Sequence, residues 1–265
     1  MRGWSVLFRK EWRESLRNFK LIWIPLVFLL LGVAQPVTSK LLPDLVKQAG
    51  NLPEGAVMVI PVPQPMEVLA GTLSNYSTVG LLVLVLATMA AVAGERSRGV
   101  TGMLMAKPIS AAAYLSSKWS ATVLLSTGSL VIGYLGAWYY TEILIGPIDA
   151  GLALQGLALY ALWFAFYLTV TLVLSALMRS AVAAAAITLL SAALLAVLGS
   201  SLPQWMKASP GILTARAQEL LLGGLAQGTG GSVLLPVCIT GIGLILLMVV
   251  GIAVFRRLPL TPQDS

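Results

Sequence analysis

Residues 68–94 read VLAGTLSNYSTVGLLVLVLATMAAVAG, a run of 27 residues between Glu67 and Glu95 that contains no Asp, Glu, Lys or Arg. A helix that crosses the hydrocarbon core of a bilayer needs about 20 predominantly apolar residues. The run is therefore long enough to span a membrane, and it predicts that the chain lies in a bilayer rather than in water.

The rest of the chain has the same character. Of its 265 residues, 58% are apolar and 10% are charged, whereas a soluble domain has about 25% charged residues. Five further gaps between charged residues are 19 to 36 residues long. We therefore expect an all-α membrane protein with six transmembrane helices in a single domain over residues 1–265. The spans are expected at about 21–40, 68–93, 119–141, 150–178, 182–202 and 233–255.

The distribution of Lys and Arg predicts the orientation. Thirteen of these 17 residues lie in the N-terminal 20 residues, in the loop 94–118, at Arg179 and at Arg256 and Arg257, and only four lie in the opposite segments. Because Lys and Arg accumulate on the cytoplasmic side, both termini are expected in the cytoplasm. The pI near 9.8 then reflects anchoring charge and not nucleic-acid binding.

The N-terminal residues 4–19 have a helical pattern of apolar and charged positions. They predict an amphipathic helix in the headgroup layer, in contact with the lipid bilayer. Two interpretations are open: a simple anchor for the first span, or an elbow helix that also contacts a cytoplasmic partner. The apolar face comprises Trp4, Phe8, Trp12, Leu16 and Phe19, and the charged face comprises Arg9, Lys10, Arg13, Glu14 and Arg17.

The loop 94–110, GERSRGVTGMLMAKPIS, differs from a passive linker. A charged start is followed by a short apolar run, then by Pro108, and a helix is expected to restart at Ala111. Exposed apolar residues between charges are typical of a segment that docks into a groove of another protein. The alternative is a cytoplasmic loop whose apolar residues dip into the membrane surface.

The remaining segments support simpler expectations. Five prolines in 41–66 predict an irregular external loop, and residues 212–225 predict a short interfacial or re-entrant helix. Small residues in the third and fifth spans favour close helix packing or a dimer seam. Pro25 or Pro36 could mark a broken helix. The aromatic belt explains Trp23, Trp138, Tyr139, Tyr140, Trp163 and Trp205. Two roles, lining a path or bonding the helix's own backbone, are open for Ser126, Thr127, Ser129, Thr169, Thr171, Ser175, Thr188 and Ser191.

Several chemistries lack their required residues. The chain has no His and a single Cys, Cys238, which excludes His-based catalysis and a Cys or His metal cluster. No P-loop motif occurs, so the chain cannot be a P-loop ATPase. The predicted spans contain no ionisable residue that could relay protons. We expect no enzyme activity, no metal and no cofactor in this chain.

The leader RKEWRESLR (9–17), the six spans and the loop 94–110 together resemble the permease subunits of ABC-2 type transporters. This resemblance covers essentially the whole chain and implies that the loop docks on a separate ABC ATPase subunit, which binds ATP and Mg. It also implies a second permease copy or a related permease, export and a bacterial plasma or inner membrane. The implied coupling residues are Glu95, Arg96, Arg98, Gly99, Leu104 and Pro108.

The resemblance has one departure, because Val100 stands where many relatives carry Thr after the Gly. The family moves drugs, peptides, polysaccharides, lipids and ions, so no single substrate is implied. The alternative function is a non-transport scaffold or sensor in which the spans only anchor a binding loop. An integral-membrane enzyme is a third, weaker hypothesis, because the chain lacks His and paired intramembrane carboxylates.

Overall fold

The computed structural model describes residues 2–49, 63–99, 109–178, 180–202, 205–206, 209–223 and 232–257. All regular structure within these ranges is helical. Within the same ranges, six segments are long and apolar enough to cross a membrane, which confirms the predicted all-α fold with six candidate spans. The six candidate spans are Lys20–Leu42, Pro65–Ser97, Ala111–Leu144, Ala150–Leu177, Ala181–Gly199 and Leu234–Phe255.

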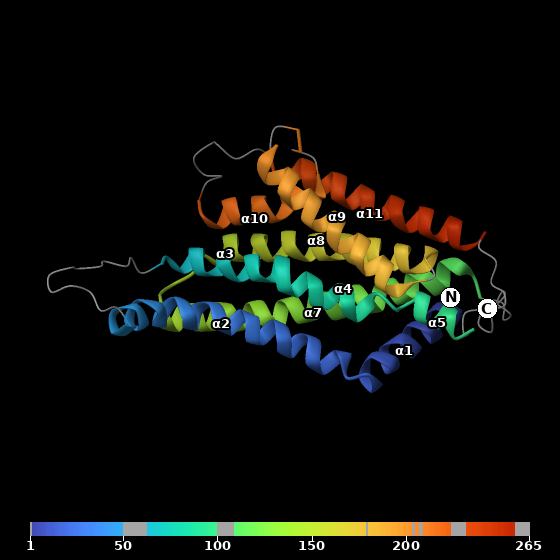
Figure 1. The fold of residues 1–265 in the computed structure, drawn as a ribbon, viewed down its shortest axis with the longest axis horizontal. Helices are drawn as coiled ribbons and strands as arrows, with labels where there is room; N and C mark the ends of the chain where they lie inside the picture. Colours follow the sequence, from blue (N-terminus) through green and yellow to red (C-terminus); the bar gives the residue numbers. More distant parts are fainter. Residues whose placement is uncertain are drawn as a thin grey trace.

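The helices form an elongated bundle (Figure 1). Its most central helix, α8, packs against α4, α7, α9, α10 and α11. The start of α1 and the end of α11 lie at the same end of the bundle, where Leu7 and Phe255 share one buried cluster. The helices are α1 (Arg2–Arg17), α2 (Lys20–Ala49), α3 (Pro65–Asn75), α4 (Leu81–Thr88), α5 (Ala93–Ser97), α7 (Ala111–Leu144), α8 (Ala150–Leu177), α9 (Ala181–Ser201), α10 (Leu213–Leu221) and α11 (Leu234–Phe255), with a π-helix η1 (Tyr76–Gly80) and a 3-10 turn η2 (Pro210–Ile212).

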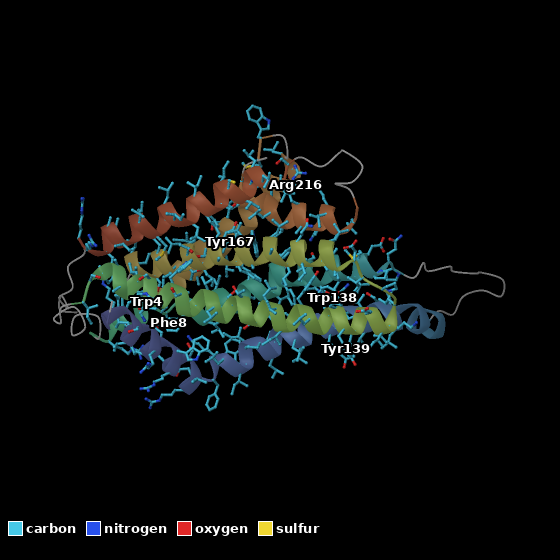
Figure 2. The ribbon with its side chains drawn as sticks, turned by 180° about the vertical axis from the view of Figure 1, so that it is seen from behind. Trp4, Phe8, Trp138, Tyr139, Tyr167 and Arg216 are labelled. Carbon is cyan, nitrogen blue, oxygen red and sulfur yellow. The ribbon has the colours of Figure 1, made fainter. Side chains whose placement is uncertain are left out.

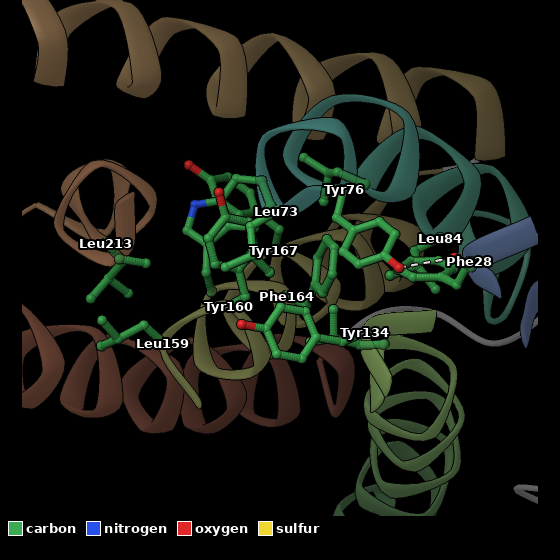
Figure 3. Close-up of a cluster of buried hydrophobic side chains, with 14 of the residues drawn as sticks. Phe28, Leu73, Tyr76, Leu84, Tyr134, Leu159, Tyr160, Phe164, Tyr167 and Leu213 are labelled. Carbon is green, nitrogen blue, oxygen red and sulfur yellow. Dashed lines mark hydrogen bonds between the residues drawn. The ribbon is translucent and has the colours of Figure 1, made fainter. Parts of the chain in front are cut away.

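Aromatic side chains fill the middle of the bundle (Figure 3). Tyr76 donates a hydrogen bond of 2.9 Å to the carbonyl oxygen of Phe28, which joins the second span to the first. Trp163 is only 3% exposed, and its ring lies 4.9 Å from that of Tyr167. The belt interpretation is therefore wrong for Trp163, which lies in the middle of α8, where aromatic neighbours surround it.

The second span is not one continuous α-helix. The π-helix η1 separates α3 from α4, and a turn over residues 89–92 separates α4 from α5. The hydroxyl of Ser175 in α8 accepts hydrogen bonds from the backbone N–H groups of Val92 and Ala93, at 3.2 and 3.1 Å, and donates to the carbonyl oxygen of Met89 at 2.6 Å. These bonds satisfy the backbone groups that the break exposes.

Two expectations about the first span were wrong. The helix α2 runs without interruption through Pro25 and Pro36, so neither proline breaks it. The same helix continues to Ala49, whereas an irregular loop was expected from residue 41. Only one of the five prolines, Pro43, falls in 41–49, and the strong helix formers Leu, Lys, Gln and Ala dominate there. In the segment expected to form a short interfacial or re-entrant helix, α10 confirms a helix within 212–225.

Most polar side chains inside the spans bond to their own helix. The hydroxyls of Ser129, Thr171 and Thr188 donate to carbonyl oxygens one turn earlier, at 2.8 to 2.9 Å. Ser175 differs, because its partners lie in the second span. These contacts favour bonding to the helix's own backbone, rather than lining a path, for Ser129, Thr171 and Thr188.

Candidate functional site

Five side chains from three helices meet at the end of the bundle where α1 lies. Lys10 and Glu11 come from α1, Glu95 comes from α5, and Tyr114 and Lys118 come from α7. The Lys118 ammonium lies 3.0 Å from Glu95 Oε1 and 2.8 Å from Glu11 Oε1. Lys10 also pairs with Glu95 Oε1, and Tyr114 donates a 2.6 Å hydrogen bond to Glu95 Oε2. We call these five residues the ionic cluster.

The centre of the ionic cluster, formed by Glu95 and Lys118, is buried. The side chains of Glu95 and Lys118 are 5% and 2% exposed. A buried charge is strongly destabilising unless an opposite charge and hydrogen bonds compensate it. The cluster contains two carboxylates and two ammonium groups, so the charges balance, and separating α1, α5 and α7 would leave buried charges unpaired.

The environment also affects the titration of Lys10. Burial alone would lower the pKa of its ammonium, but the hydrogen bond to Glu95 and the charges of Glu11 and Glu95 outweigh burial and raise the pKa above its usual value. Lys10 is therefore protonated throughout the neutral pH range, and its pairs persist there.

A cluster of buried apolar residues packs next to the ionic cluster. Leu7 of α1, Val92 before α5, and Leu172 and Ala176 of α8 form a second buried cluster together with Tyr114 and other residues. The ring of Tyr114 stacks on Phe255 at the end of α11, with 5.5 Å between the ring centroids. Because Tyr114 belongs to both clusters, the charges are held against a packed apolar base.

The residues after Glu95 lead toward the loop that was predicted to dock. Arg96 donates a 3.3 Å hydrogen bond to the carbonyl oxygen of Ala176, which ties α5 to the end of α8. Arg98 is exposed and donates to the carbonyl oxygen of Gly94 at 2.8 Å. Gly99 has φ of 72°, a conformation that side chains disfavour. Leu104 and Pro108 lie outside the described residues.

The contacts of α1 define three faces rather than the two expected from sequence. Figure 2 shows Trp4 and Phe8 on this helix. On one side Trp4, Phe8 and Trp12 stack, with ring centroids 5.3 and 6.1 Å apart. Arg9 and Arg13 lie on a second, exposed side. Lys10 and Glu14 were expected to share the face of these arginines. Instead Lys10 pairs with the buried Glu95 of the bundle, and Glu14 pairs with Lys10 and lines the cavity beside Glu95.

A polar cavity of about 210 Å³ adjoins the ionic cluster. Glu14, Lys20, Thr88 and Arg98 contribute to its lining along with cluster residues. The Lys20 ammonium donates a 2.6 Å hydrogen bond to the carbonyl oxygen of Ala87, just before the break in the second span. The cavity therefore lies between α1, the start of α2, the break and α7.

Three carboxylates in this region come close enough together to suggest a cation site. Oxygens of Glu11, Glu14 and Glu95 lie within 4.8 Å of one another. However, Lys10 lies within ion-pairing distance of all three, and Lys118 pairs with Glu11 and Glu95. We assign these carboxylates to the two ammonium groups, because a metal ion would have to displace both.

Sequence reasoning identified Glu95 but not its partners. Lys118 was counted only as an anchoring charge, and Lys10 was assigned to the charged face of the N-terminal helix. Nothing in a linear pattern relates Glu95 to Lys10, which lies 85 positions before it. The sequence did place Lys10 and Glu14 one turn apart in the same helix, and this spacing indicates an ion pair between them. The hydrogen bonds of Ser175 to the break in the second span could not be predicted, because the sequence shows only that this residue is polar.

Comparison with known proteins agrees with this architecture. The chain matches the family described as "ABC-2 family transporter protein" over residues 5–257. It is 34% identical over 224 residues to the "Uncharacterized transmembrane protein YxlG" of Bacillus subtilis strain 168, and the aligned region covers 84% of this chain and 87% of that protein. With six candidate spans, these matches identify a multi-pass integral membrane protein.

Proposed function

Because the chain belongs to the ABC-2 family of transporter proteins, we propose that it is the permease subunit of an ATP-driven ABC exporter whose ATPase is a separate chain. ATP and Mg are bound by that partner, since this sequence has no P-loop motif. The permease pairs with a second copy of itself or with a relative, and two ATPase subunits serve the pair.

The observation that carries the proposal is the ionic cluster. Glu95 opens the segment that leads into the loop 94–118, and the same side chain is paired with α1 through Lys10 and with α7 through Lys118. A push on this loop by the closing ATPase is therefore passed to α1 and α7 together. Rigid-body movement of the spans then converts the push into alternating access.

The proposal places the end of the bundle that carries the ionic cluster in the cytoplasm. The excess of 13 Lys and Arg residues over four supports this side. In this orientation α1 lies at the cytoplasmic membrane surface, and the residues proposed to couple to the ATPase are Arg96, Arg98, Gly99, Leu104 and Pro108.

The experiment that tests the function is a mild-detergent purification of the tagged chain from its native host, followed by an assay of the co-purified proteins for ATP hydrolysis. Arg98→Ala is the informative variant, because this side chain is exposed and, among the described residues, its hydrogen bond goes to the carbonyl oxygen of Gly94 in its own turn. We expect this variant to lose ATPase binding or to uncouple ATP hydrolysis from transport. Arg257→Ala, exposed at the same end of the bundle, is the matched control.

One outcome would contradict the proposed function, and a second would contradict only the position of the docking segment. If the chain were recovered without a nucleotide-binding protein in several detergents, a scaffold or sensor role would replace transport. If Arg98→Ala and Arg257→Ala retained the ATPase and its coupling equally, the transporter could stand but the docking segment would lie elsewhere.

A further inference from the structure

The exposed face of α1 carries an uncompensated positive charge. Arg9, Arg13 and Arg17 are one turn apart and all three are exposed. Both acidic residues of this helix, Glu11 and Glu14, lie on the side of the ionic cluster. No ion pair to the three guanidinium groups forms within the described part of the chain, and we call them the arginine row.

The stacked aromatic side chains lie beside the arginine row. Trp4, Phe8 and Trp12 form a stack, and the apolar stripe extends along the chain to Leu16 and Phe19, which are 50% and 66% exposed. The first candidate span begins at the next residue, Lys20. An exposed apolar stripe that ends where a span begins lies at the depth of the lipid headgroups, with its rings toward the acyl chains.

We propose that α1 is a binding site for anionic phospholipid of the cytoplasmic leaflet. The aromatic stripe enters the acyl region, and the arginine row binds headgroup phosphates. Arg9 and Arg13 border a shallow hollow that Ser5, Val6 and Lys10 also line. Guanidinium groups bind phosphate oxygens in a bidentate way, so this hollow is suited to one phosphodiester.

The same hollow reaches the ionic cluster. Lys10 lines it and pairs with Glu95. An anion between Arg9 and Arg13 therefore acts on the ion pairs that hold α1 against α5 and α7. The site gives the lipid headgroup a way to change how firmly α1 is attached to the bundle.

An acidic surface of a partner protein is the competing occupant. Lipid is favoured because the arginine row and the aromatic stripe are adjacent along the whole helix, whereas an aqueous protein surface would match only the charges. The inference depends on the placement of α1 at the membrane surface and not on the ATPase. It can therefore fail while the transporter function holds, and the reverse is also true.

The test measures lipid binding to the purified full-length chain in detergent by native mass spectrometry. Phosphatidylglycerol is compared with phosphatidylcholine, for the wild type and for R9Q/R13Q. Each arginine near an anionic headgroup contributes about a five-fold factor in affinity, so the double variant is expected to bind phosphatidylglycerol roughly 25-fold more weakly. High salt should reduce the difference.

The control variant is R256Q/R257Q, which removes two exposed positive charges at the same end of the bundle, where the neighbouring Phe255 is buried. It is expected to bind both lipids as the wild type does. R9K/R13K, which keeps the charge but not the bidentate geometry, should be intermediate. Inorganic phosphate at equal ionic strength should not displace the lipid, which separates a headgroup site from a free-anion site.

Several outcomes would overturn the proposal. These are equal phosphatidylglycerol binding by R9Q/R13Q and the wild type, an equal loss in R256Q/R257Q, and displacement by inorganic phosphate. Loss of a co-purified protein without loss of lipid would assign the arginine row to a protein surface. Thermal unfolding of each variant in the same detergent confirms that it is folded. If R9Q/R13Q does not fold, lipid binding by R9K/R13K is compared with that of the wild type instead.

Discussion

Glu95 is the side chain on which the attachment of α1 depends. Its Oε1 atom pairs with the ammonium groups of Lys10 and Lys118, its Oε2 atom accepts a hydrogen bond from Tyr114, and the side chain is buried. Glu95→Gln removes the charge and leaves the buried Lys118 with one carboxylate. Breaking a buried pair costs about 3–5 kcal/mol, so we expect a clear fall in the thermal midpoint in detergent.

The control for this variant is Glu142→Gln, because Glu142 is exposed and accepts one hydrogen bond from Trp138. Its substitution should change stability by no more than about 0.5 kcal/mol. Equal midpoints for the two variants would mean that the cluster does not stabilise the fold. A double-mutant cycle with Lys118→Gln should show strong coupling to Glu95→Gln, since the two side chains are in contact.

Among the helices, α2 and α7 pack most closely. A Cβ atom at Gly133 would lie 2.5 Å from the carbonyl oxygen of Phe28. Because this oxygen belongs to the backbone, rotation of a side chain cannot relieve the contact. Gly133→Ala should therefore push the two helices apart and destabilise the chain by about 1–3 kcal/mol. Gly128→Ala in the same helix meets nothing within 4 Å and should be neutral or slightly stabilising.

Thermal unfolding of the two glycine variants in the same detergent gives the comparison. Similar midpoints would contradict the close approach of α2 and α7. The result also bears on the small residues that favoured either close helix packing or a dimer seam, because Gly133 and Gly136 both contact the first span of the same chain.

The short helix α5 is held by a hydroxyl from α8. Ser175→Ala leaves the backbone N–H groups of Val92 and Ala93 without their acceptor, at a cost of about 1–3 kcal/mol for each unsatisfied group. We expect faster hydrogen exchange in a peptide that covers residues 88–97. Ser129→Ala is the control, since that buried hydroxyl bonds only to its own helix. Unchanged exchange in Ser175→Ala would show that α5 is held mainly by Glu95.

The spans could be predicted from sequence because the condition for them is local: a run of about 20 residues without charge is sufficient. The ionic cluster could not be predicted, because Lys10, Glu95 and Lys118 meet only after three helices have packed. The same holds for the faces of α1. Helical period separated its aromatic residues from its charges, but the buried partners in α5 and α7 decided which charges turn inward.

Taken as a whole, the molecule has most of its positive charges at one end of the bundle, while the acidic residues Glu67, Glu142 and Asp149 belong to the other end. The ionic cluster, the arginine row and the exposed Arg257 all lie at the positive end, while the connection between α7 and α8 lies at the other. If the positive end faces the cytoplasm, a membrane-impermeant maleimide added to intact cells should label a cysteine at the opposite end only. The chain is suited to this test because Cys238 is its single native cysteine.

In a Cys238→Ser background, we expect Pro147→Cys, in the exposed α7–α8 connection, to react in intact cells. Arg257→Cys, in the exposed turn after α11, should react only after the membrane is permeabilised. The reverse pattern would place the ionic cluster outside the cell, where no ATP-driven partner could push on it. The helices α8, α9 and α11 provide three crossings between the two positions, so these positions should lie on opposite sides of the membrane. Labelling of both positions in intact cells would contradict this odd number of crossings.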